Sequence, residues 1–238
     1  MWSIENIASC IEAGLVREAS RLELEQAVYG LDSRGEAPLQ LQIAEALQAA
    51  GHGVYREQRY PAYRSCRRES EGERCDLVLT PNARPLAAQE RNPTLFDTTD
   101  AVALADAYWM EIKVVAQFTT RGPNPRYSSL FGPVRRDITK LSKQPGILHA
   151  GLLIVLFVED KKVADHDLRV WTSQCKEHGH RIGRPALRSV AVSDRLGNNF
   201  CRLALFPVQP PKPARVQGAV GAHAVNTSSP RPRSGNRR

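Results

Sequence analysis

The sequence predicts an α/β fold in which helices flank a mixed central sheet and the core elements follow the order α-β-β-β-α-β. Three observations lead to this prediction. Residues 38–50 repeat apolar side chains at helical spacing, several later segments are short and rich in β-branched or aromatic residues, and turn residues separate these segments. With 238 residues, of which 42% are hydrophobic, the chain can bury the core of one domain.

The first half of this core is a helix followed by three strands. The helix is expected over residues 38–50, with its start near Glu36 and its stop at Gly51, because glycine is favoured just after a helix. The three strands are expected at residues 54–60, 74–80 and 108–115.

The second half begins with a helix over residues 134–143 and a solidly apolar strand over residues 151–158. Another helix is expected at 165–177, with Asp165 or Asp167 as its N-cap. Two short strands, at 189–193 and 201–206, are expected to extend the sheet.

Three other segments lie outside this core. Residues 1–32 predict an N-terminal helical appendage, so that the domain itself spans residues 33–206. Residues 81–107 are irregular and contain three prolines, which is typical of a surface insertion. Residues 207–238 are rich in Pro, Gly, Ser and Arg with almost no large apolar residues, and this composition predicts a disordered basic tail.

The net charge points only weakly to a nucleic-acid partner. The chain carries a formal charge of +8, but six basic residues and no acidic ones lie in the tail, so the rest of the chain carries +2. No apolar stretch is long enough to span a membrane, and the N-terminus does not have the layout of a secretion signal. The five scattered cysteines form no Cys-x-x-Cys pair, so we expect reduced thiols in a cytoplasmic protein.

Charged residues interrupt two of the expected strands. The two-residue period of a strand places Glu111 and Lys113 on one face, opposite Met110 and Ile112. Asp76 likewise stands alone between apolar neighbours in the preceding strand. Charges in apolar strands are costly unless they serve a ligand or reach water. If the two strands are neighbours, Asp76 and Glu111 can converge.

Such a convergence would suit a divalent metal ion. Two carboxylates and a backbone carbonyl are the hard oxygen ligands that Mg²⁺ prefers, and they leave positions open for water and a phosphate oxygen. An ammonium group beside them, here that of Lys113, can orient an attacking water or neutralise charge that builds up on phosphorus. The reaction class that fits is phosphodiester hydrolysis.

Asp76, followed by Glu111-Ile112-Lys113 on the next strand within an α-β-β-β-α-β core, resembles the PD-(D/E)XK, or restriction-endonuclease-like, nuclease superfamily. The resemblance covers roughly residues 36–158. It implies that Asp76 and Glu111 bind Mg²⁺, which Mn²⁺ could replace, and that Lys113 is the catalytic lysine. It also implies the Ile112 carbonyl as a third ligand and Glu36, on the first helix, as a further candidate.

The sequence departs from the family pattern at two points. Cys75 stands where the name of the family expects proline, which is the loosest part of that pattern. The spacing from Asp76 to Glu111 is also long. Three other aspartates therefore remain as rivals for the first carboxylate: Asp97, Asp100 and Asp106.

Basic residues gather on the helix that follows the motif, where they could contact the phosphates of nucleic acid. They are Arg135, Arg136, Lys140 and Lys143. With the motif, they favour a metal-dependent DNA endonuclease with DNA as its partner. Cutting both strands of a duplex usually requires two active sites, which would favour a homodimer.

Other interpretations remain open for each of these features. Glu111 and Lys113 could form an ion pair on an edge strand, and Glu36 could form a capping box with Ser33. The basic helix face could simply be solvated. For the whole protein, the alternatives are a catalytically inactive nuclease fold that binds nucleic acid or serves in assembly, and an α/β interaction protein unrelated to nucleic acid.

Overall fold

The computed structural model describes residues 2–61, 73–87, 100–144 and 146–209. Its centre is a six-stranded mixed sheet with the strand order β1-β2-β3-β6-β8-β7. The strands β3 and β6 are parallel to each other, and every other neighbouring pair is antiparallel. The chain therefore has the α/β fold with a mixed, helix-flanked sheet that the sequence predicts.

The strands of this sheet are β1 (Gly53–Arg59), β2 (Arg74–Thr80), β3 (Tyr108–Ala116), β6 (His149–Val158), β7 (Ala186–Ala191) and β8 (Phe200–Val208). A small hairpin of β4 (Phe118–Thr119) and β5 (Gly122–Pro123) follows β3. The helices are α1 (Ile4–Leu24), α2 (Glu36–Ala49), α3 (Tyr127–Lys143) and α4 (Lys161–Glu177), and Leu31–Ser33 and Pro81–Ala83 form short 3₁₀ turns. From α2 to β6 the main elements follow the predicted order.

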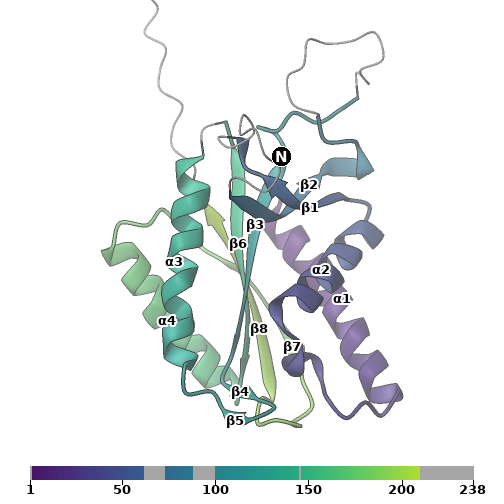
Figure 1. The fold of residues 1–238 in the computed structure, drawn as a ribbon, viewed down its shortest axis with the longest axis vertical. Helices are drawn as coiled ribbons and strands as arrows, with labels where there is room; N and C mark the ends of the chain where they lie inside the picture. Colours follow the sequence, from purple (N-terminus) through teal and green to yellow (C-terminus); the bar gives the residue numbers. More distant parts are fainter. Residues whose placement is uncertain (1, 62–72, 88–99, 145, 210–238) are drawn as a thin grey trace, which may run out of the picture.

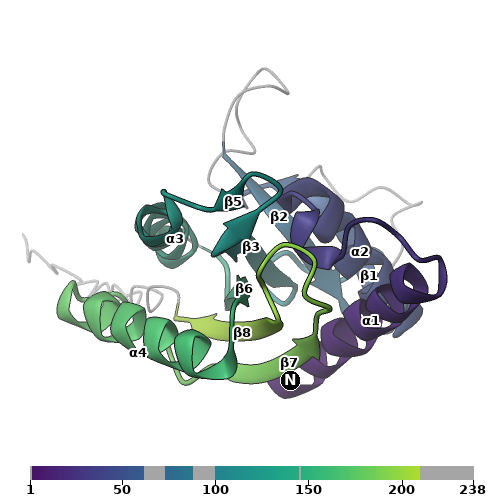
Figure 2. The ribbon, with the colours of Figure 1, turned by 90° about the horizontal axis from the view of Figure 1, so that it is seen from below.

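Helices cover both faces of the sheet. Figures 1 and 2 show α1 and α2 on one side and α3 and α4 on the other. Each face has its own buried cluster. The first joins apolar residues of α1 and α2 to Leu77, Met110 and Ile112 of the sheet. The second joins those of α3 and α4 to Val78 and Trp109, as expected from the alternation of side chains along a strand.

The N-terminal helix is part of the domain and not the appendage that we expected. The side chains of Ile7, Ile11 and Leu15 are almost fully buried, and they belong to the same cluster as α2 and the sheet. Helix α1 also packs beside β7 at the end of the sheet (Figure 2). The sequence showed the apolar spacing of this helix but not the surface that its apolar side covers.

Several boundaries differ from the prediction. Helix α3 begins at Tyr127, before its internal Pro133 and seven residues earlier than expected. The N-cap of α4 is Asp160, whose carboxylate accepts from the N–H of Val163, in place of Asp165 or Asp167. Strands β7 and β8 extend the sheet, as predicted.

Parts of the expected insertion and the whole of residues 210–238 lie outside the described residues. A parallel bridge between Leu86 and Val102 joins the two described ends of the insertion. Val102 and Ala107 are buried, so this part of the segment is tied to the domain. In the described ranges, no helix is both long and apolar enough to cross a bilayer. The four described cysteines are free thiols, and Cys66 lies outside these ranges.

Strands β2 and β3 separate part-way along their length. They are paired only from Leu77 with Met110 to Leu79 with Tyr108. Strand β3 continues to Ala116 and stays paired with β6 throughout, while the first residues of β2 stay paired with β1. From Glu111 onward, the edge of β3 that faces β2 therefore has no ladder partner among the described residues. The charged residues singled out in the sequence lie at this opening.

Candidate functional site

Glu111 is a buried carboxylate on the sheet face that α3 covers. It lies on a central strand, and it is only 1% exposed. The hydroxyl of Tyr60, at the end of β1, donates a hydrogen bond to Oε1 of Glu111. The Tyr60 ring in turn stacks on Trp109, with 5.6 Å between the ring centroids. This packing fixes the orientation of one carboxylate oxygen.

Asp76 lies at the point where β2 leaves β3. Its Oδ2 accepts a hydrogen bond from the backbone N–H of Ile112 at 2.7 Å. The side chain thus satisfies a backbone group that a continuing strand would have satisfied. Because the N–H and C=O of one strand residue point to the same side, we expect the Ile112 carbonyl to face the same opening.

The side chain of Cys75 does not follow the expected alternation. Regular alternation along β2 would place it on one face with Leu77 and Leu79, but it belongs to the opposite cluster, with Tyr60 and Val78. Its thiol donates to the carbonyl of Met110 across the opening, with 3.3 Å between the atoms. The regular pleat of β2 is therefore broken beside Asp76.

Lys113 reaches from β3 to both layers of helices. Its Nζ is 2.8 Å from Oε1 of Glu36, in the first turn of α2, and 3.9 Å from Oδ2 of Asp137, on α3. The cation next to Glu111 is Lys140. An ion pair between Glu111 and Lys113 on an edge strand was the alternative explanation for these two residues. The structure contradicts it, because β3 is a central strand and Lys113 contacts Glu36 and Asp137.

Glu36 does not form the capping box that its spacing from Ser33 favoured. The N-cap of α2 is Gly35, which makes no side-chain hydrogen bond. The hydroxyl of Ser33 instead donates to the carbonyl of Gly30 within a 3₁₀ turn. The carboxylate of Glu36 is therefore directed to Lys113 at the candidate site.

Two residues of α3 complete the arrangement. Lys140 places its Nζ 2.9 Å from Oδ1 of Asp137 and 3.8 Å from Oε1 of Glu111. Acids and lysines therefore alternate along an ion-pair series that joins α2, β3 and α3. We call this series the charge chain: Glu36, Lys113, Asp137, Lys140 and Glu111.

The buried charges shift one another's pKa values. Burial, with the nearby charge of Asp76, raises the pKa of Glu111 from about 4.5 to about 8, and the hydrogen bond from Tyr60 and the charge of Lys140 only partly oppose this. Burial alone would lower the pKa of Lys113, but its contacts with Glu36 and Asp137 outweigh burial and raise it. Lys113 is therefore an ammonium group at neutral pH.

The two rival aspartates that the structure describes do not approach Glu111 as Asp76 does. Asp100 is exposed and pairs with Arg84 at 2.8 Å, and the backbone of Asp106 binds the indole of Trp2. Asp97 lies outside the described residues. Of the described aspartates considered as the first carboxylate, Asp76 is the one that contacts β3, the strand of Glu111.

The residues present fit a magnesium ion held by few protein ligands. In the described part of the chain, no three His, Cys, Asp or Glu side chains are grouped so as to hold a metal ion. Mg²⁺, however, keeps several of its waters and is often held by only one or two carboxylates. Asp76 and Glu111 could supply those, with the Ile112 carbonyl as a third oxygen. Burial and the nearby negative charge of Asp76, which together raise the pKa of Glu111, are consistent with such a site.

An open cavity of about 670 Å³ lies beside this group. Its lining includes Lys113, Asp137 and three of the four basic residues that the sequence suggested for nucleic-acid binding: Arg136, Lys140 and Lys143. The fourth, Arg135, lies on another side of α3, where its charge acts on Cys175 and His180. The structure therefore does not bring Arg135 to the cavity.

The contacts of Tyr60 and Asp137 were not predicted from the sequence. The sequence predicts Tyr60 only as the last residue of a strand. Asp137 falls within the buried stripe of α3, between Val134 and Leu141, and is itself 4% exposed. An acid at a core position of a basic helix is the signal that could have found it.

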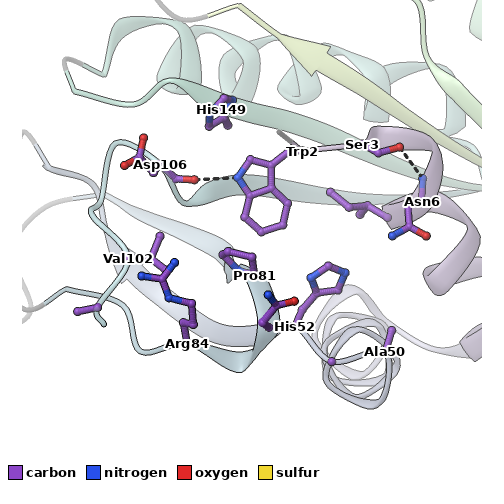
Figure 3. Close-up of a pocket in the computed structure, with 14 residues that line it drawn as sticks. Trp2, Ser3, Asn6, Ala50, His52, Pro81, Arg84, Val102, Asp106 and His149 are labelled. Atoms are coloured by element: carbon purple, nitrogen blue, oxygen red, sulfur yellow. Dashed lines mark hydrogen bonds between the residues drawn. The ribbon is translucent and has the colours of Figure 1, made fainter. Parts of the chain in front are cut away.

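A second cavity, of about 580 Å³, lies at the other end of α2. Figure 3 shows Trp2 at its centre, with His149 on one side and Pro81 and His52 on the other. The indole nitrogen of Trp2 donates to the backbone carbonyl of Asp106 at 2.8 Å. None of the candidate site residues lines this cavity, so it is separate from the charge chain.

None of the comparisons of this chain with protein-family models, curated proteins and solved structures gives a match.

Glu111 predicts how stability depends on pH in the metal-free protein. Folding raises the pKa of Glu111 from about 4.5 to about 8, so the folded protein binds this proton more tightly than the unfolded chain does. The stabilisation of the folded state by the bound proton is fully present below the pKa of the unfolded chain and is lost as the pH rises through about 8. We expect Glu111→Gln to be more stable than the wild type by about 2–4 kcal/mol near pH 9 in EDTA, with little difference near pH 5. Urea unfolding across this range measures the effect.

The matched control is Asp100→Asn, which removes an exposed acid and should leave the pH dependence unchanged. If the stability curves of the wild type and Glu111→Gln run parallel from pH 5 to pH 9, Glu111 is not the buried acid described.

Proposed function

We propose that this protein is a metal-dependent nuclease that hydrolyses phosphodiester bonds, with DNA as its substrate and an endonucleolytic mode of cutting. The observation that carries the proposal is the placement of Asp76, Glu111 and Lys113 around one opening between β2 and β3. The mixed sheet, with a helix-strand-strand-strand-helix-strand order from α2 to β6, supports the resemblance to the PD-(D/E)XK superfamily.

Mg²⁺ bound by Asp76, Glu111 and the Ile112 carbonyl would supply a Lewis acid that polarises the scissile phosphate and favours deprotonation of the attacking water. In this chain the Ile112 N–H fixes one oxygen of Asp76, and Tyr60 fixes one oxygen of Glu111. Both carboxylates are thereby oriented before a ligand arrives, which lowers the cost of reorganisation during the reaction.

Lys113 acts in this proposal as a cation rather than as a base. Its contacts with Glu36 and Asp137 keep it protonated. It can therefore donate a hydrogen bond to the attacking water and stabilise negative charge on the phosphate oxygens. The attacking water gives up a proton to solvent, its oxygen forms a bond to phosphorus, the bond from phosphorus to the 3′-oxygen breaks, and that oxygen takes up a proton from solvent. The products carry a 5′-phosphate and a 3′-hydroxyl.

The neighbouring cavity supports a polyanionic substrate. Arg136, Lys140 and Lys143 lie one to two turns apart on α3, and all three line it together with Lys113. Basic side chains on one helix face can follow the phosphates of a nucleic-acid strand. The cavity therefore supplies binding next to the site where cleavage is proposed.

A second candidate function is nucleic-acid binding without cleavage. The observation that favours it is the position of Lys140, whose ammonium already lies 3.8 Å from Glu111 and balances part of its charge. A protein that had lost metal binding could keep its carboxylates in this way. Cleavage assays separate the two functions, whereas an interaction protein unrelated to nucleic acid would show neither cleavage nor salt-dependent binding.

The first test is cleavage of supercoiled plasmid and of single-stranded DNA in Mg²⁺, Mn²⁺ or EDTA. We expect cutting that depends on the metal. Lys113→Met should slow it by about 100-fold or more, because it removes the cation beside the phosphate but keeps most of the side-chain volume. Lys161→Met is the control, since Lys161 lies on the exposed surface of α4, where it pairs with Asp165.

The outcomes are distinct. Cutting that persists in EDTA, or at the wild-type rate in Lys113→Met, would contradict the proposed mechanism. DNA binding without any cutting by the wild-type protein would favour the second function.

The position of Arg136 predicts its contribution to DNA binding. Arg136→Ala should weaken binding several-fold and reduce the slope of log affinity against log salt by about one, because one phosphate contact is lost. Arg135→Ala is the matched control on the same helix, since Arg135 does not line the cavity. Fluorescence anisotropy between about 50 and 200 mM KCl measures both variants. Equal losses in the two variants would show that the cavity is not the binding surface.

A further inference from the structure

Asp137 is the central member of the charge chain. Its two oxygens face different lysines: Oδ1 lies 2.9 Å from Lys140, and Oδ2 lies 3.9 Å from Lys113. The outer acids each contact one lysine, because Glu36 is next to Lys113 and Glu111 is next to Lys140. Asp137 is therefore the residue through which the two lysines are connected.

The environment of Asp137 is unusual for a surface-helix acid. Its side chain is 6% exposed, and Oδ2 is buried without a hydrogen-bond partner. Burying a carboxylate is costly unless nearby cations balance it. At 3.9 Å, the contact of Oδ2 with Lys113 is one of charge rather than a hydrogen bond. A residue needed only for packing at this position would be apolar.

We propose that Asp137 is a positioning residue that orients the ammonium groups of Lys113 and Lys140 on the two sides of its carboxylate, the first facing the reacting phosphate and the second facing a neighbouring phosphate in the cavity. The role in cleavage rests on the proposed nuclease function. The positioning itself does not, because it follows from the geometry of the chain.

Loss of the charge on Asp137 would divide the chain into two separate pairs. Of its two partners in the charge chain, Lys113 would keep only Glu36, whose side chain is 38% exposed, and its ammonium would be less constrained. Lys140 would retain only Glu111, 3.8 Å away, as its charge-chain partner. Both lysines would lose a carboxylate partner while the rest of α3 stayed in place.

The test measures how fast each lysine is acylated by an N-hydroxysuccinimidyl acetate reagent, with quantification of peptides by mass spectrometry. In the full-length protein in EDTA, Asp137→Asn should raise the labelling of Lys113 and Lys140 by about fivefold, because each loses a carboxylate partner. Lys161 and Lys176, both on α4, are the internal references and should not change. Asp137→Glu, which keeps the charge, should restore much of the protection.

A second variant should lower the labelling of Lys113, whereas Asp137→Asn should raise it. Lys140→Met leaves Asp137 with Lys113 as its charge-chain partner, so the labelling of Lys113 should fall. Lys140 is partly exposed, with 28% of its side chain accessible, and its replacement should be tolerated. This variant keeps the proposal testable if Asp137→Asn does not fold.

Cleavage is measured on the same variants in single turnovers. Asp137→Asn should lower the rate at saturating DNA by about tenfold or more, and Asp137→Glu should recover part of it. If the wild-type protein does not cut DNA but the labelling pattern is as expected, the nuclease function fails and the positioning role stands. Unchanged labelling of Lys113 in both variants, or an equal rise at every lysine, would overturn the proposal.

Discussion

The hydrogen bond from the Ile112 N–H to Asp76 is the interaction on which the arrangement of the site depends. It satisfies a backbone donor of β3 at the point where β2 turns away, so the two strands can separate without leaving that group unpaired. The separation opens the β3 edge beside Glu111 and Lys113. Without it, a continued pairing of β2 with β3 would stand between Lys113, on the α3 face of the sheet, and the first turn of α2 on the other face.

Once the sheet has opened, several charges lie close together in a site of low exposure. The structure balances them by alternation: each lysine of the charge chain lies between two acids, and its central acid lies between two lysines. The balance is incomplete at Glu111, where burial and Asp76 still raise the pKa. The nearby lysines therefore do not fully balance the negative charge of two oriented carboxylates. This imbalance would favour a divalent cation over a purely structural ion-pair network.

Local sequence patterns predicted most of the fold, because they depend on near neighbours. The bounds of β2 follow from the short apolar run within residues 74–80. The end of α2 follows from Gly51, which takes a positive φ of 86°. The prediction failed where long-range packing decides. The sequence of α1 does not show that its apolar side covers the sheet. Ser33 and Glu36 have the spacing of a capping box, but the N-cap of α2 is Gly35.

The candidate site was predictable to a similar extent. Asp76, Glu111 and Lys113 stood out as charges within apolar strands, and the three-dimensional structure places them together. The contacts of Tyr60 and Asp137 depend on how β1 and α3 approach β3, which no local pattern records. Arg135 and Arg136 are neighbours in sequence, and only the orientation of α3 directs one of them to the cavity.

The most direct test of the central claim is the location of a bound metal ion. Crystals of the full-length protein grown with MnCl₂ can be measured for anomalous scattering from manganese. The account predicts a peak between the carboxylates of Asp76 and Glu111, within coordination distance of the Ile112 carbonyl, and its loss in crystals of Asp76→Asn. A well-ordered site without a peak there, or a peak that persists in Asp76→Asn, would contradict the account.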